Sequence, residues 1–297
     1  MLRRILLSGS LVLLTALLWY LFIKSEDYLA TLKVKATPGT INQTIKLWES
    51  TLENSDVIDQ NKVDVFEHQI TFSDSVYNYK WAIEKIDDSL SLVQVHIKDI
   101  DNSIKNRLFM PFSNTDFEKR SKETVFKFHK KLQEHLDNFK VTVMGIDSIT
   151  DTFCAYIPIK STQLEKASKM MQNYPILDGF VSNSRIQTNG QPFIEVIEWN
   201  REKDSITYNF CYPIKKIDSL PIHKTIRYKE RKGGKAFKAI YNGNYITSDR
   251  AWYSLLNEAE KRNIKVTGKP VEIFFTNPNM GSNELEWIAN IYMPLLN

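Results

Sequence analysis

The chain has 297 residues, which is enough for two ordinary domains and a membrane anchor. Its 42% hydrophobic and 25% charged residues are typical of a folded globular protein and exclude a disordered or fibrous chain. The net charge of +4, from 39 basic and 35 acidic residues, is too small to indicate a nucleic-acid-binding face. No nucleic acid is therefore expected as a partner.

The first feature along the chain is an apolar segment at 5–23, preceded by Arg3 and Arg4. As a helix, its length of roughly 30 Å matches the hydrocarbon thickness of a bilayer. A cleaved signal peptide is the alternative, but bulky residues at 19–22 stand where small residues would precede a cleavage site. We therefore predict a single-pass anchor at 1–26. The two arginines favour a cytoplasmic N-terminus, with the domains exported to the periplasmic side.

The segment 27–138 is predicted to be one domain that combines strands and helices. Its predicted elements are a strand at 31–36, a short helix at 40–49, strands at 76–86 and 90–97, and an amphipathic helix at 121–136. On residues 32–38, which lead into the helix carrying Trp48, this segment resembles the START-like helix-grip family, also called SRPBCC or polyketide-cyclase-like. The resemblance implies a curved sheet around a long helix, often with an apolar ligand between them. A purely structural domain is the alternative.

The second half of the chain contains an internal repeat. The motif Gly-Gln-Pro-Phe at 190–193 is echoed by Gly-Lys-Pro-Val at 268–271, and Asn-Phe-Cys-Tyr-Pro-Ile at 209–214 is echoed by Asn-Ile-Tyr-Met-Pro-Leu at 290–295. Each repeat, at about 150–214 and 228–297, is predicted to fold as strand, helix, strand, strand. Two such units related by a pseudo-two-fold axis would join their sheets and leave a groove between the helices. A duplication without a ligand is the alternative.

The repeat carries motifs of a known family. They are a Tyr-Asn-Gly-Asn-Tyr turn at 241–245, the paired Gly-x-Pro strand starts at 190–192 and 268–270, Asn-Pro at 277–278, and a closing strand at 287–295. On these motifs the segment 139–297 resembles the GyrI-like family, the effector-binding domain also found at the end of multidrug-sensing transcription activators. The whole chain is thus expected to be an α+β protein with a transmembrane helix, a START-like domain and a GyrI-like domain.

The family resemblance implies a groove lined by aromatic side chains and usually one buried acid, which together hold a small amphipathic or aromatic ligand. Where the family places that acid, this chain has the uncharged Asn290, so a neutral ligand is as consistent as a cation. The alternative acids are Glu286 and Glu284, which are near in sequence, and Glu195 and Glu272 in the repeated strands. The predicted ligand-binding residues are Tyr156, Tyr212, Tyr241, Trp252, Tyr253, Phe275, Glu286, Asn290 and Tyr292. For each aromatic residue, ordinary core packing is the alternative.

No catalytic residue, cofactor or metal site is predicted. Some members of the family are hydrolases that use a glutamate and a tyrosine, but the asparagine at 290 argues against that activity here. The five histidines lack metal-binding spacing, and nucleophile-elbow, Walker and dinucleotide motifs are absent from the sequence. A GyrI-like hydrolase and a protein-interaction module without ligand remain the alternative functions, and no protein partner can be named.

Two further features leave alternatives open. The basic run at 215–235 is either a solvated linker or a contact to anionic lipid headgroups. Cys154 and Cys211 are the only cysteines, and a single bridge between them would require an oxidising compartment.

Overall fold

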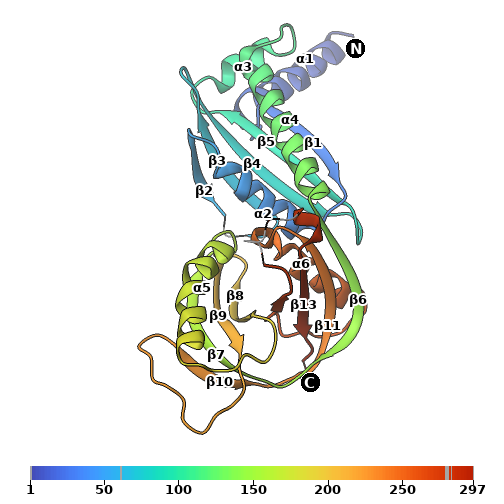
Figure 1. Ribbon diagram of the computed structural model, residues 1–297. Coiled ribbons are helices and arrows are strands. Elements are labelled where there is room, and N and C mark those ends of the chain that lie inside the picture. Colours follow the sequence, from blue (N-terminus) through green and yellow to red (C-terminus); the bar gives the residue numbers. More distant parts are fainter. Residues whose placement is uncertain (1, 61, 278–280, 282, 297) are drawn as a thin grey trace. The chain divides into compact units, whose positions relative to one another are not determined.

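The computed structural model describes residues 2–60, 62–277, 281 and 283–296 (Figure 1). It divides into two compact units, Met1–Leu132 and Gln133–Asn297. Each unit contains an antiparallel sheet with helices, so the α+β class holds for both. The sequence placed the boundary at 138/139, whereas the structure divides the chain within a long helix, α4 (Asp116–Asp137).

The chain begins with the apolar helix α1 (Leu2–Leu18), which continues as the π-helical turn η1 (Trp19–Ile23). The segment Leu6–Ile23 has 18 residues, a mean hydropathy of 2.2 and no buried residue. It is long and apolar enough to cross a bilayer, and signal sequences share these properties.

The sheet of the N-terminal unit has five strands in the order β1-β5-β4-β3-β2. The strands are β1 (Tyr28–Val34), β2 (Ser55–Asp59), β3 (Val65–Thr71), β4 (Val76–Lys85) and β5 (Ser91–Asp99). Tyr77, Tyr79, Trp81 and Ile83 alternate with more exposed residues along β4, as a strand with one buried face requires. The sequence predicted β1, β4 and β5 and missed β2 and β3.

Three helices complete this unit: α2 (Pro38–Glu49), α3 (Ser103–Phe109) and the first part of α4. Thr37 caps α2, because its hydroxyl accepts a hydrogen bond from the Thr40 amide at 3.4 Å. Phe128 of α4 packs 5.4 Å from Trp48 and 4.6 Å from Trp81, measured between ring centroids. Both predicted helices therefore cover one sheet, while the START-like assignment stays a prediction.

His68 of β3 is buried among four aromatic rings. The ring centroids of Trp48, Phe66, Tyr79 and Trp81 lie 5.4–6.2 Å from its imidazole. Its Nδ1 is 2.8 Å from the Ser55 hydroxyl, and its Nε2 has no hydrogen-bond partner in the described part of the chain. Burial in these apolar surroundings lowers the pKa of His68 to about 4.

This lowered pKa predicts that acid destabilises the N-terminal unit. The unfolded chain binds a proton at His68 near pH 6.5 and the folded chain only near pH 4, so the stabilisation is present above pH 6.5 and is lost as the pH falls toward 4. Between pH 7 and pH 4, we expect the protonation of His68 to lower the free energy of unfolding by about 2 to 3 kcal/mol. Denaturant titrations at several pH values should show a flatter profile for His68→Gln, and an equally steep profile would contradict the assignment.

The sheet of the C-terminal unit has eight strands in the order β10-β7-β9-β8-β12-β13-β11-β6. The strands are β6 (Phe139–Ile149), β7 (Thr152–Ser161), β8 (Phe193–Asn200), β9 (Ser205–Pro213), β10 (Arg227–Arg231), β11 (Gly234–Gly243), β12 (Val271–Phe274) and β13 (Ile288–Pro294). The helical segments are α5 (Lys166–Asn183), η2 (Tyr245–Thr247), α6 (Arg250–Lys261) and η4 (Glu284–Glu286). The central pair is β8 and β12, with Val271 opposite Glu195.

The two faces of this sheet differ. The helices α5 and α6 pack on one face, where they form one core with strand residues such as Phe210, Tyr241 and Ile291. On the other face, Cys154 and Cys211 are buried free thiols in a smaller cluster with Phe193, Val271 and Tyr292. Basic side chains lie over the rings there: Lys238 over Tyr292, Lys229 over Tyr156 and Arg231 over Phe193.

Candidate functional site

A pocket of about 310 Å³ opens on the helix-covered face of the C-terminal sheet. Its described lining residues are Met170, Met171, Tyr174, Asp178, Thr188, Gly190, Gln191, Pro192, Phe210, Tyr212, Tyr245, Phe274, Phe275, Thr276 and Asn277. Aromatic and thioether side chains dominate this wall, as in small-molecule sites of this size. The wall thus combines α5, the loop before β8, β9, η2 and the end of β12.

The spacing of residues on each element explains why these side chains meet. On α5, Met170, Tyr174 and Asp178 are four residues apart and so lie on one side of the helix. On β9, Phe210 and Tyr212 are two residues apart and point to the same face of the sheet.

The loop before β8 reaches the pocket through a glycine turn. Gly190 has a φ of 138°, a backbone conformation that residues with a Cβ rarely adopt. The repeated glycine at 268 also has a positive φ, of 66°. The Gly-x-Pro motif in the sequence therefore marks a real turn in both repeats, and the first of these turns places Gln191 and Pro192 at the pocket.

Asp178 and Tyr212 form the polar part of the pocket wall. Among the described lining residues, Asp178 is the only one with a charged side chain. The Tyr212 hydroxyl donates a hydrogen bond to its carboxylate at 3.3 Å, and the ring of Tyr174 lies edge-on to that of Tyr212 at 6.1 Å. Burial, together with these two neighbours, raises the pKa of Tyr212, so its hydroxyl stays a hydrogen-bond donor at neutral pH.

A buried ion pair lies at the central seam of the same sheet. The Glu272 carboxylate, on β12, is fully buried and both of its oxygens lie 2.9 Å from Nζ of Lys166, the first residue of α5. The Ser248 hydroxyl and the Trp252 indole Nε1 also donate to Glu272, at 2.8 and 2.5 Å. Burial raises the pKa of Glu272, while the ammonium of Lys166 and the hydroxyl of Ser248 oppose that rise.

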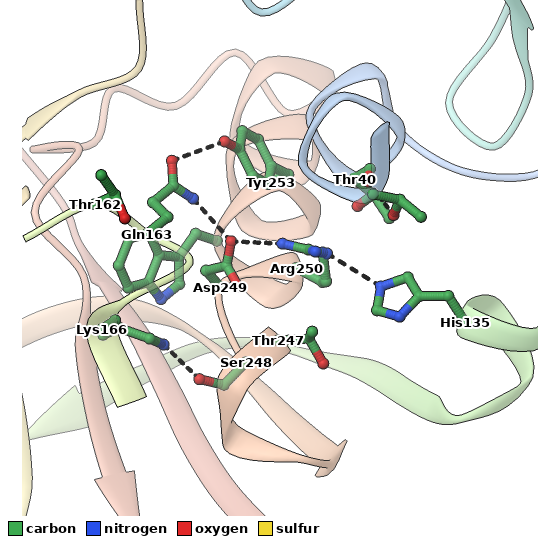
Figure 2. A network of polar contacts seen from close by, with 12 residues as sticks. Thr40, His135, Thr162, Gln163, Lys166, Thr247, Ser248, Asp249, Arg250 and Tyr253 are labelled. Atoms are coloured by element: carbon green, nitrogen blue, oxygen red, sulfur yellow. Dashed lines mark hydrogen bonds and ion pairs between the residues drawn. The ribbon is translucent and has the colours of Figure 1, made fainter. Parts of the chain in front are cut away.

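A second group of contacts joins the N-terminal ends of α5 and α6 (Figure 2). The Gln163 side-chain amide donates to the Asp249 carboxylate at 2.8 Å, and Arg250 Nη1 donates to the same oxygen at 2.8 Å. Arg250 Nε donates to His135 Nε2 at 3.2 Å, and burial together with this guanidinium lowers the pKa of His135 to about 3. The two helix ends are therefore tied to each other by hydrogen bonds and charge.

Three of the nine predicted residues, Tyr241, Trp252 and Tyr253, are buried in these contacts and their surroundings. Trp252 binds Glu272, the Tyr253 hydroxyl lies 3.1 Å from Gln163 Oε1, and the Tyr241 hydroxyl lies 2.8 Å from that of Thr247. These three side chains are not among the described lining residues of the pocket beside α5.

The other predicted residues are distributed over three places. Tyr212 and Phe275 line the pocket, Phe275 with 47% of its surface exposed. Tyr156 and Tyr292 lie on the face of the sheet away from the helices, and strand alternation places Asn290, two residues before Tyr292, on that face as well. Glu286 is exposed in η4. Of the nine predicted ligand-binding residues, the structure thus brings two, Tyr212 and Phe275, together in the pocket.

Sequence reasoning missed six residues of the pocket wall. They are Met170, Tyr174 and Asp178 of α5, and Phe210, Tyr245 and Phe274 of other elements. The buried positions of α5 are Lys166, Ala167, Met170, Leu177 and Val181. A helical stripe counted from Ala167 through Met170 and Tyr174 would have reached the pocket.

No metal centre is formed in the described part of the chain, where no three His, Cys, Asp or Glu side chains gather in a ligating arrangement. The residues of the pocket supply aromatic faces, thioethers and one carboxylate. These groups are chemically suited to contact with an apolar or amphipathic molecule.

No protein-family model matches the chain, and no curated protein matches it either. Solved structures are similar to it over about half its length. The EcmrR C-terminal domain is 16% identical, with a TM-score of 0.44 over 54% of this chain and 98% of that domain. SAV2435 bound to tetraphenylphosphonium is 11% identical, with a TM-score of 0.40 over 52% and 94% of the two chains. A hydrolase from Listeria innocua is 10% identical, with a TM-score of 0.34 over 51% and 92%.

Proposed function

We propose that this chain is a membrane-tethered protein that binds a small aromatic or amphipathic molecule in the pocket beside α5. The observation that carries the proposal is the composition of the pocket wall, in which Tyr174, Phe210, Tyr212 and Phe274 surround a space of about 310 Å³. Such a wall offers ring faces and apolar area to a ligand, beside polar groups that can orient it. The tether in this proposal is the apolar helix of the N-terminal unit.

The same proposal includes the finer family assignment. The C-terminal unit is a GyrI-like domain of two βαββ repeats, and its strand order supports this because β7-β9-β8 is mirrored by β11-β13-β12 across the β8–β12 pair. The N-terminal unit is START-like, with its long helix against one antiparallel sheet. The domains are exported, and the ligand is sensed, carried or sequestered.

The charge of the preferred ligand follows from two carboxylates. Glu272 is the buried acid of the seam, but Lys166 already neutralises it, so it is not available to a cation. Asp178 is half-buried on the pocket wall and accepts a hydrogen bond from the Tyr212 hydroxyl. A ligand with a positive or hydrogen-bond-donating group beside an aromatic ring fits this arrangement best.

Two isosteric probes test this proposal. Phenyltrimethylammonium and tert-butylbenzene have the same shape and differ in charge, and their binding to the full chain can be measured by thermal shift and calorimetry. We expect both to bind, the cation more tightly, and Asp178→Asn to weaken the cation about tenfold, or ~1.4 kcal/mol, while leaving the neutral probe unchanged. Tyr174→Ala should weaken both probes.

The matched control is Asp218→Asn, an equal change of charge in the loop between β9 and β10, which should alter neither affinity. Equal binding of both probes to Asp178→Asn and to the original chain would exclude a charge-reading pocket. No binding of either probe, nor of larger aromatic molecules, would exclude the small-molecule function itself.

A further inference from the structure

A second cavity lies in the N-terminal unit, where the apolar helix ends. It has a volume of about 350 Å³ and is lined on one side by Leu21, Phe22 and Lys24 at the end of that helix. The opposite wall comprises Lys98, Ile100, Asp101, Asn102, Ser103, Ile104, Lys105 and Arg107, from the end of β5 to α3. We call it the exit groove. Its residues have no part in the pocket beside α5.

Arg107 holds the two walls of the exit groove together. Its guanidinium is buried and donates from Nη1 to the carbonyl oxygens of Tyr20 and Leu21, at 3.0 and 3.1 Å, and from Nη2 to that of Lys24 at 2.7 Å. Nε donates to the buried Asp27 carboxylate at 2.6 Å. The last carbonyls of the helix, which otherwise lack partners, are thus bound by α3, which Figure 1 shows beside α1. The groove therefore has a fixed place relative to the helix end.

The position of the groove along the helix sets its depth in a membrane. The apolar segment of 18 residues that ends at Ile23 spans about 27 Å as a helix, close to the thickness of the hydrocarbon layer. Lys24 follows at once. If the helix crosses a bilayer, as the proposed function states, Lys24 and the groove lie in the layer of phosphate headgroups.

The chemistry of the groove matches that layer. Lys98 and Lys105 are exposed, and Lys24 lies 3.7 Å from Glu26. Asp101 is the one carboxylate among the described lining residues, so the lysines exceed it three to one. Asn102 and Ser103 add polar groups beside the apolar Phe22 and Ile104. A phospholipid combines a phosphate with acyl chains, so its binding site requires cationic side chains beside apolar surface.

Apolar side chains continue from the groove onto the exposed surface of α3. Ile104 and Leu108, four residues apart on one side of the helix, are each 46% exposed, and Phe112 is 89% exposed just beyond it. Exposure of these apolar side chains to water is unfavourable. The acyl chains and glycerol backbones next to a headgroup would cover them.

From these observations we propose that the exit groove binds one anionic phospholipid, whose phosphate lies among Lys24, Lys98 and Lys105 while Ile104, Leu108 and Phe112 enter the adjoining acyl region. A lipid bound at this site would hold the N-terminal unit against the membrane surface. It rests on the tethering helix of the proposed function and is independent of the ligand pocket.

Native mass spectrometry of the full-length protein in a non-ionic detergent tests the site. Phosphatidylglycerol and phosphatidylcholine with identical acyl chains are titrated in turn. We expect one phosphatidylglycerol to bind about tenfold more tightly than phosphatidylcholine, and Lys98→Gln/Lys105→Gln to remove that preference. The control is Lys33→Gln/Lys35→Gln, which removes the same charge from exposed lysines around the far end of β1 and should keep the preference.

Four results would overturn the proposal. They are equal affinity for both lipids, an equal loss in the control variant, displacement of the lipid by glycerol 3-phosphate at the same concentration, and an intact mass that lacks the N-terminal helix. The last of these would also remove the tether, and the first three would leave the tether and the pocket standing.

Discussion

Replacing Lys166 with methionine is expected to lower the free energy of unfolding of the C-terminal unit by about 3 to 5 kcal/mol. Methionine has a similar length but leaves the carboxylate of Glu272 without a cation in a fully buried position. The remaining donors from Ser248 and Trp252 do not neutralise its charge. Thermal and denaturant unfolding of the full chain, followed by tryptophan fluorescence, would measure the loss.

The double variant Lys166→Met/Glu272→Gln should recover most of this stability, because no charge is then left unpaired and the amide still accepts from Trp252. Lys238→Met removes a cation at the same 2.9 Å from a carboxylate, that of Asp147, but in a pair that solvent reaches, with side chains 22% and 45% exposed, and should have a much smaller effect. A double variant as unstable as Lys166→Met would show that the lost packing of the lysine side chain, and not the charge, matters.

The pH dependence of Lys166→Met gives an independent check. Loss of the ammonium removes the group that opposes the raised pKa of Glu272, so that pKa rises further. A carboxyl group with a raised folded pKa binds more protons when folded, so stability falls as pH rises from its ordinary pKa to its raised one. The difference in stability between Lys166→Met and the original chain should therefore shrink as the pH is lowered through that range.

Replacing Arg107 with methionine is expected to have an effect of similar size in the N-terminal unit, about 3 to 5 kcal/mol. The change leaves the buried carboxylate of Asp27 without its cation and removes the donors to three carbonyl oxygens at the end of the apolar helix. We expect lower thermal stability in detergent and faster proteolysis around residues 24–27, because the helix end is no longer held by α3.

Arg120→Met is the matched control for Arg107. Arg120 also bonds an aspartate, Asp74, at 2.5 Å, but both side chains are exposed to solvent. Its removal should change stability little, since solvent screens such pairs. If both arginine variants unfolded alike, the burial of the Arg107 pair would not be what stabilises the helix end.

Much of the fold could be predicted because periodicity and capping are local. The alternation along β4 is found where the sequence indicates it, and the Thr-x-x-Glu pattern of Thr162 and Glu165 forms reciprocal hydrogen bonds just before α5. The Gly-x-Pro repeat also marked the turns at Gly190 and Gly268. Each of these signals depends on neighbours within a few residues.

Elements without a local signal were missed. The strand β6 has few buried positions, and it is fixed by pairing with β11, whose partner residues lie 85 to 104 positions further along the chain. The strand β10, Arg-Tyr-Lys-Glu-Arg, lies within a basic run that the sequence predicts as a linker. Its charged residues do not show the usual pattern of a strand, although it pairs with β7 at the sheet edge.

The candidate site was only partly predictable for the same reason. Tyr212 and Phe275 were found as aromatic residues of the repeats. The sequence also offered Glu272 as an acid, but not its partner: Lys166 is 106 residues away in the chain, and only the fold shows that the charge is already neutralised. Asp178, on the pocket wall, has no motif around it.

The ties between Gln163 and Asp249 and between Lys166 and Glu272 have a consequence for how molecules exchange with the pocket. They join the two repeats, because Gln163 and Lys166 come from the first repeat and Asp249 and Glu272 from the second, and we expect them to oppose a separation of the two halves of the sheet. In the proposed function, we therefore expect the ligand to enter where α5 meets the loop at 188–192, and there the unbranched thioethers of Met170 and Met171 can adapt to ligands of differing shape.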